Sequence, residues 1–92
     1  MSDKSYHLII KGVVQGVSYR YYSSEEAKKL GLKGWVRNLN NGNVEMEISG
    51  EEEVLTLMVN WCYQGSPSAE VSDVEVKEIT LDQISSNFEI RT

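Results

Sequence analysis

The sequence predicts an α+β fold in which two helices cover one face of an antiparallel sheet of four to five strands. Three observations predict this class: strand-like and helical segments follow the order β-α-β-β-α-β-β, a tight turn joins the two central strands, and the chain has only 92 residues. This is the length of one domain, so residues 1–92 are expected to form a single unit. Two helices cannot cover both faces of so small a sheet, and both are therefore expected on the same face.

The strand-like segments are rich in β-branched residues or alternate between apolar and polar residues. They comprise residues 5–12, 34–39, 43–49, 71–81 and 88–91. Asn40-Asn41-Gly42 predicts a hairpin turn between the second and third strands, because Asn and Gly tolerate positive φ angles. Gly50 is expected to break the third strand.

Two helices are expected between these strands. The first is predicted over residues 20–30, where Ser23, Ala27 and Leu30 recur at helical spacing. The second is predicted over residues 51–64, because acidic residues open it and apolar residues follow at helical spacing. Strands and helices in this order are typical of the split βαβ, or ferredoxin-like, arrangement.

Composition excludes several classes of protein. Hydrophobic residues make up 40% of the chain and charged residues 25%, as in globular proteins. No apolar run approaches the roughly 20 residues of a membrane span, and the N-terminus lacks the apolar core of a secretory signal. The only cysteine, Cys62, and the only histidine, His7, exclude a disulfide framework and a His-rich or multi-cysteine metal site. We therefore expect a cytoplasmic protein that acts without a metal.

Charge is distributed unevenly along the chain. The formal net charge is −5, which argues against nucleic acids and anionic membranes as partners. Residues 1–42 nevertheless hold seven basic residues against three acidic ones, whereas residues 43–92 hold two basic residues against eleven acidic ones. An anionic ligand is therefore expected to meet the N-terminal half.

The segment Gly12–Arg20 carries the most chemical information. It reads Gly-Val-Val-Gln-Gly-Val-Ser-Tyr-Arg and joins the first strand to the first helix. Amides at a helix N-terminus lack intrahelical partners, and with the helix dipole they attract anions. The guanidinium of Arg20 can bind two oxygens at once. These features indicate a phosphate site, although the same residues also suit an ordinary strand-to-helix loop with a surface arginine.

Two longer motifs resemble a known family. Gly12–Arg20 resembles the first signature of the acylphosphatases, Gly-x-Val-Gln-Gly-Val-x-Phe-Arg, and residues 34–45 resemble the second, Gly-x-Val-x-Asn-x-x-Asp-Gly-x-Val-Glu. The resemblance extends through residues 65–71 and the C-terminal strand, and so covers nearly the whole chain. The departures are Tyr19 in place of Phe and Asn41 in place of Asp, and Asn suits the turn as well as Asp.

This resemblance implies hydrolysis of acyl phosphates to a carboxylate and inorganic phosphate, with no metal and no cofactor. We expect the protein to be a monomer. The family's phosphate-binding arginine corresponds to Arg20, and the asparagine that positions the attacking water corresponds to Asn38. The family's phosphate cradle corresponds to the loop of Val14, Gln15, Gly16, Val17, Ser18 and Tyr19. The carboxylate leaving group is a weak base, so the reaction needs no general acid.

Two other functions fit parts of the sequence. A non-catalytic ferredoxin-like module would bind a metabolite or a nucleic acid, but this chain keeps both Arg20 and Asn38 and lacks a basic aromatic sheet face. A carbamoyl-phosphate hydrolase, like the acylphosphatase-like domain of larger maturation proteins, is disfavoured by the length of the chain. The other notable side chains are expected to lie in a strand, in the core or on the surface: His7; Met58, Trp61 and Cys62; and Lys11, Arg37, Glu45, Glu47 and Glu51–Glu53.

Overall fold

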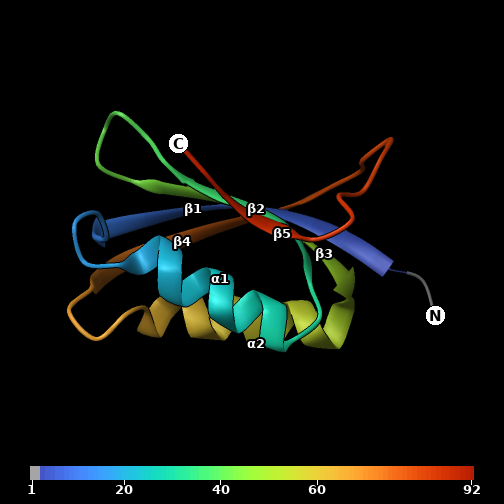
Figure 1. The fold of residues 1–92 in the computed structure, drawn as a ribbon, viewed down its shortest axis with the longest axis horizontal. Coiled ribbons are helices and arrows are strands. Elements are labelled where there is room, and N and C mark those ends of the chain that lie inside the picture. The colour runs from blue at the N-terminus through green and yellow to red at the C-terminus, as the bar shows by residue number, and fades with distance from the viewer. Residues whose placement is uncertain (1–2) are drawn as a thin grey trace.

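The computed structural model describes residues 3–92 and has the predicted order of elements (Figure 1). The elements are β1 (Asp3–Val13), α1 (Tyr19–Lys29), β2 (Lys33–Asn38), β3 (Val44–Glu51), α2 (Glu52–Gln64), β4 (Glu70–Ile79) and β5 (Phe88–Arg91). The strands form one sheet in the order β4-β1-β3-β2-β5. Both helices lie side by side on one face of this sheet, which confirms the predicted layering (Figure 1). Neither helix in the described residues is long and apolar enough to cross a membrane.

One strand pair departs from the antiparallel prediction: β5 pairs with β2 in parallel, whereas the other pairs are antiparallel. The registers explain this direction. Ile79 at the end of β4 aligns through Ser5 and Ser49 with Lys33 at the start of β2. Residues 80–87 therefore cross the sheet at one end, so that β5 begins beside the start of β2 and runs parallel to it. The expected break at Gly50 is also wrong, because Gly50 pairs with Lys4 and β3 continues to Glu51.

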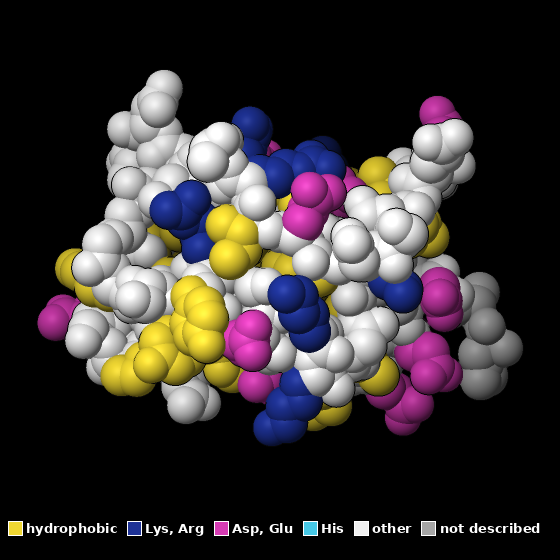
Figure 2. Space-filling view, in the orientation of Figure 1, with side chains coloured by type: hydrophobic (Ala, Val, Ile, Leu, Met, Phe, Trp, Pro, Cys, Tyr) yellow, Lys and Arg dark blue, Asp and Glu magenta, His cyan; other side chains and the backbone are white. Residues whose placement is uncertain are grey.

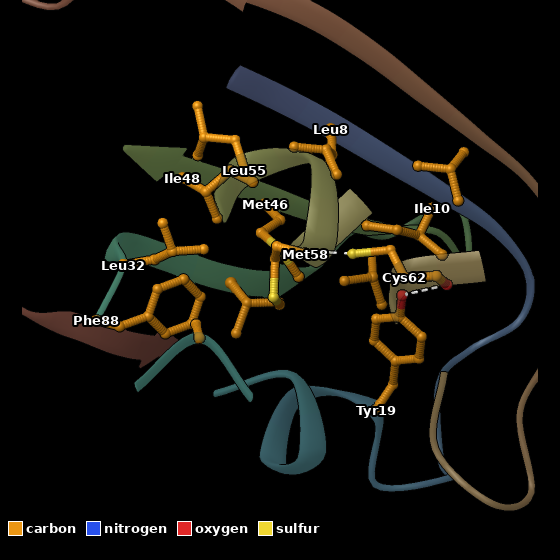
Figure 3. Close-up of a cluster of buried hydrophobic side chains, with 14 of the residues drawn as sticks. Leu8, Ile10, Tyr19, Leu32, Met46, Ile48, Leu55, Met58, Cys62 and Phe88 are labelled. Atoms are coloured by element: carbon orange, nitrogen blue, oxygen red, sulfur yellow. Dashed lines mark hydrogen bonds between the residues drawn. The ribbon is translucent and has the colours of Figure 1, made fainter. Parts of the chain in front are cut away.

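The core lies between the helices and the sheet (Figure 3). Its fully buried side chains alternate along the strands and recur along α2, and they include Leu8, Ile10, Val36, Val44, Met46, Ile48, Leu55, Met58 and Cys62. Cys62 is thus a packed thiol as expected, and burial raises its pKa to about 12. The buried residues of α1 include Ser23, Ser24 and Ala27, whose small side chains let this helix lie close to the sheet. Trp61, which was also expected in the core, is only partly buried.

Within residues 3–92 no helix covers the other face of the sheet, and charged side chains on that face pair across the strands. Glu45 was expected to face solvent, but its side chain is only 15% exposed. It accepts hydrogen bonds from Arg37 and from His7, the latter at 2.7 Å. Burial alone would raise the pKa of Glu45, but the hydrogen bonds from His7 and Arg37 outweigh it and lower this pKa. His7 lies within β1 as predicted.

Candidate active site

The loop between β1 and α1 has an unusual backbone. Next to Gly12, a register shift interrupts the pairing of β1 with β4, and a Cβ at Gly12 would lie 2.2 Å from the carbonyl oxygen of Glu70. Only glycine fits there, since real side chains do not approach so closely. Ser18, the residue before α1, has a φ of 62° and is the only non-glycine with positive φ among residues 3–92. These features turn the chain sharply from the sheet into the helix.

Four hydrogen bonds, made by three side chains, fix this loop to the rest of the fold. The amide of Gln15 donates to the carbonyls of Leu39 at 2.7 Å and Asn43 at 2.8 Å, both in the β2–β3 turn. The buried hydroxyl of Ser66 donates to the carbonyl of Val17 at 2.7 Å. Tyr19, at the start of α1, donates its buried hydroxyl to a carbonyl of α2 at 2.8 Å (Figure 3). The loop is thereby held between the hairpin and the end of α2.

The first turn of α1 presents free backbone amides. The first hydrogen bond into the helix runs from the N–H of Tyr22 to the carbonyl of Ser18 at 3.1 Å. The N–H groups of Tyr19, Arg20 and Tyr21 therefore precede the intrahelical ladder. Ser18 makes no side-chain cap, and the first turn contains no acidic residue. With the positive end of the helix dipole, these amides form a site suited to an anion.

Arg20 and Asn38 lie in one cleft beside these amides. The cleft has a volume of about 440 Å³ and is lined by Val14, Gly16, Ser18, Tyr19, Arg20, Tyr21, Asn38 and Ile90. Arg20 donates one hydrogen bond, at 3.1 Å, to the carbonyl of Arg91 at the end of β5. Because a guanidinium carries several N–H donors in a planar fork, others stay available to a ligand.

Asn38, the last residue of β2, is the second polar side chain in the cleft. Its Oδ1 is buried and has no hydrogen-bond partner among residues 3–92. Buried polar atoms are rarely left unpaired in folded proteins. An unpaired amide oxygen beside an arginine therefore points to a ligand or water that completes the site.

The predicted cradle residues divide into two groups. Gly16, Ser18, Tyr19 and Arg20 line the cleft together with Val14, whose side chain is otherwise buried in the core. The side chain of Gln15 is committed to the hairpin, and Val17 lines a neighbouring groove instead.

Other residues of the site did not stand out in the sequence. Tyr21 and Ile90 line the cleft, and Arg91 and Ser66 hold parts of it through hydrogen bonds. Tyr21 directly follows Arg20 at the start of the helix. Ser66, Ile90 and Arg91 lie in segments that share the family resemblance, but nothing in those segments assigns them a role. These three reach the site through tertiary structure, which local sequence patterns do not encode.

Comparison with known proteins connects this site to a family. The acylphosphatase family model matches residues 6–90. An acylphosphatase from Anaeromyxobacter dehalogenans is 43% identical over 84 residues, which cover 91% of this chain and 90% of that protein. The crystal structure of the acylphosphatase from Bacillus subtilis superimposes with a TM-score of 0.92 and 38% identity, covering 97% of this chain and 99% of that one.

A longer protein contains a similar unit. The structure of T. kodakarensis HypF matches with a TM-score of 0.85 and 29% identity, and the match covers 97% of this chain but 12% of that one. The relatives of comparable length and the family model agree with each other and with the sequence signatures. The chain therefore belongs to the acylphosphatase family of enzymes, which hydrolyse acyl phosphates.

Proposed function

We propose that Arg20 and the amides of residues 14–20 bind the phosphoryl group of an acyl phosphate, and that Asn38 orients the water that attacks it. The observation that carries this proposal is the buried Oδ1 of Asn38, which has no hydrogen-bond partner in residues 3–92 and belongs to the same cleft as Arg20 and the first turn of α1. An amide has no proton affinity near neutral pH, so Asn38 positions water and does not act as a base.

The proposed reaction requires the protein to position the water and the phosphoryl group and to stabilise negative charge. The water oxygen forms a bond to phosphorus while the bond between phosphorus and the acyl oxygen breaks, and the leaving carboxylate takes the electron pair. The proton of the water passes to a phosphate oxygen of the substrate. Phosphoryl transfer has a loose transition state with charge spread over the equatorial oxygens. Arg20 and the backbone amides are suited to stabilise this charge, because they are fixed before the substrate binds.

Two classes of substrate, which differ in the acyl group, fit the proposed reaction: general acyl phosphates and carbamoyl phosphate. Carbamoyl phosphate, the alternative raised by the sequence, is the second candidate, and the chain does match a segment of a longer protein. The higher identity to acylphosphatases of this length favours general acyl phosphates. Turnover of benzoyl phosphate and of carbamoyl phosphate, measured side by side, distinguishes the two: the first is expected to be the better substrate.

The roles of the two residues are tested by substitution. Arg20→Ala is expected to weaken inhibition by inorganic phosphate and to lower kcat, and Arg20→Lys is not expected to restore either, since a point charge cannot form two parallel hydrogen bonds. Asn38→Ala is expected to lower kcat by about 10²-fold while the phosphate Ki stays near its original value. Thermal unfolding of each variant serves as the control for folding. Near-normal kcat in Asn38→Ala, or normal phosphate binding in Arg20→Ala, would contradict the assigned roles.

A further inference from the structure

A groove adjoins the phosphate cleft and has no role in the proposed chemistry. Two neighbouring hollows that share Tyr22 and Pro67 form it, and we call it the Tyr22–Pro67 groove. Its lining includes Val17, Tyr22, Trp61, Pro67, Ser68 and Ala69. The groove shares Gly16 and Ser18 with the cleft, but Arg20 and Asn38 do not line it.

The lining of this groove is uncharged and combines the side chains of Tyr22, Trp61 and Pro67 with serine and glutamine residues. No Lys, Arg, Asp or Glu is among the described residues that line it. Hydrophobic side chains gather at this end of the molecule, over the start of α1 and the α2–β4 connection, beneath a basic side chain (Figure 2, left). Apolar surface that stays open beside a polar site often marks a ligand contact.

Two tyrosines connect the cleft to the groove. Tyr21 lines the cleft and Tyr22 lines the groove, and their rings meet edge to face with centroids 5.3 Å apart. Both rings remain open to solvent, at 57% and 42% exposure, although aromatic side chains gain free energy when they are buried. A ligand that leaves the cleft over Tyr21 would therefore meet a second aromatic ring at once.

The direction of the reaction is consistent with an acyl group in this groove. In-line displacement places the attacking water and the leaving group on opposite sides of phosphorus. Asn38, which we assign to the water, lies in the cleft and outside the groove. The acyl group is therefore expected to leave the cleft away from Asn38. Gly16, which lines both the cleft and the groove, has open space at its Cβ position.

We propose that the Tyr22–Pro67 groove is the acyl-binding site and that Tyr22 is a specificity-determining residue. This inference rests on the proposed roles of Arg20 and Asn38. The chemistry of the groove fits uncharged acyl groups that are aromatic or branched, because such groups bury apolar surface against Tyr22 and Pro67 without desolvating a charge. An acetyl group offers only one methyl group to bury against Tyr22 and Pro67, so small acyl phosphates are expected to bind mainly through the phosphoryl group.

The test compares kcat/KM for benzoyl phosphate and for acetyl phosphate. Tyr22→Ser is expected to lower the value for benzoyl phosphate by about three- to tenfold, the scale of one aromatic contact, and that for acetyl phosphate by less than about twofold. Tyr22→Phe keeps the ring and is expected to retain the original ratio. Leu57→Ser, which removes another exposed apolar side chain from α2, is the matched control and is expected to leave both values unchanged.

Each contrary outcome has a distinct meaning. An unchanged benzoyl-to-acetyl ratio in Tyr22→Ser overturns the acyl site while leaving the roles of Arg20 and Asn38 intact. A selective loss for benzoyl phosphate in Ile90→Ser but not in Tyr22→Ser places the acyl group on the β5 side of the cleft and also overturns the proposal. Failure of the unmodified protein to hydrolyse either compound counts against the proposed function itself.

Discussion

The side-chain amide of Gln15 donates a hydrogen bond of 2.8 Å to the carbonyl oxygen of Asn43. A second bond, of 2.7 Å, runs from the same amide to the carbonyl of Leu39. Leu39 directly follows Asn38, so Gln15 joins the loop that presents the free amides to the hairpin that presents Asn38. Gln15 is therefore the side chain that joins the two halves of the proposed site directly.

Gln15→Ala is expected to impair both stability and turnover. It leaves two carbonyls without their donor, which costs about 1–3 kcal/mol, and it loosens the spacing between loop and hairpin, which lowers kcat by about tenfold or more. Gln15→Glu is expected to lower stability and kcat further, because it places a negatively charged carboxylate next to two carbonyl oxygens. The control is Asn43→Ala, which keeps the backbone carbonyl that accepts the bond. Equal kcat in Gln15→Ala and Asn43→Ala would show that the link does not position the site.

Tyr19→Phe is expected to lower the free energy of unfolding by about 1 kcal/mol. The hydroxyl of Tyr19 donates to the carbonyl of Cys62, in the last turn of α2, where carbonyls lack intrahelical donors. Phe removes the donor and leaves this buried oxygen unpaired. Tyr63→Phe is the comparison, because the Tyr63 hydroxyl makes a longer bond of 3.3 Å and its side chain is exposed. Chemical denaturation should show a larger loss in the free energy of unfolding for Tyr19→Phe than for Tyr63→Phe. Equal losses would show that the buried hydrogen bond stabilises the fold no more than the exposed one.

Local patterns were sufficient to predict the elements of this fold. The alternation of Val44, Met46 and Ile48 identified the buried face of β3, and Gly31 lies just after the end of α1 at Lys29. The direction of β5 could not be predicted in the same way. Residues 80–87 connect the end of β4 to the start of β5, and the position of these two points in the sheet sets the direction of β5. Those positions depend on the registers of all the strands together.

The candidate site also has a part that the sequence predicts and a part that it does not. Arg20 and Asn38 stand in recognisable motifs, and both line the cleft. The contacts that hold the site were not predictable, because the acceptors of Gln15 and of Arg20 are backbone carbonyls, which every residue carries. The carbonyl of Arg91 lies 71 residues from Arg20 in the sequence, and only the tertiary structure brings them together.

Hydrolysis of acyl phosphates is expected to continue in excess EDTA. Among residues 3–92, the His, Cys, Asp and Glu side chains form no group of three or more that could hold a metal ion. The polar side chains of Arg20 and Asn38 in the cleft supply a cation and a neutral amide, whereas Mg²⁺ prefers carboxylates and water. The measurement is the initial rate with and without the chelator. Loss of turnover in EDTA, followed by recovery on adding Mg²⁺, would contradict the proposed metal-free mechanism.

Acid is expected to destabilise the protein partly through Glu45. Its pKa is lowered in the folded state, so its contribution to stability is fully present above the unfolded value of about 4.5 and is lost as the pH falls through the folded pKa. Glu45→Gln lacks this contribution, and its free energy of unfolding should approach that of the unmodified protein as the pH falls from about 6 to about 3. Urea denaturation across this range measures the difference. Glu25→Gln, which changes an exposed carboxylate on α1, should keep a constant difference; the same constancy in Glu45→Gln would show that its contacts with His7 and Arg37 do not stabilise the fold.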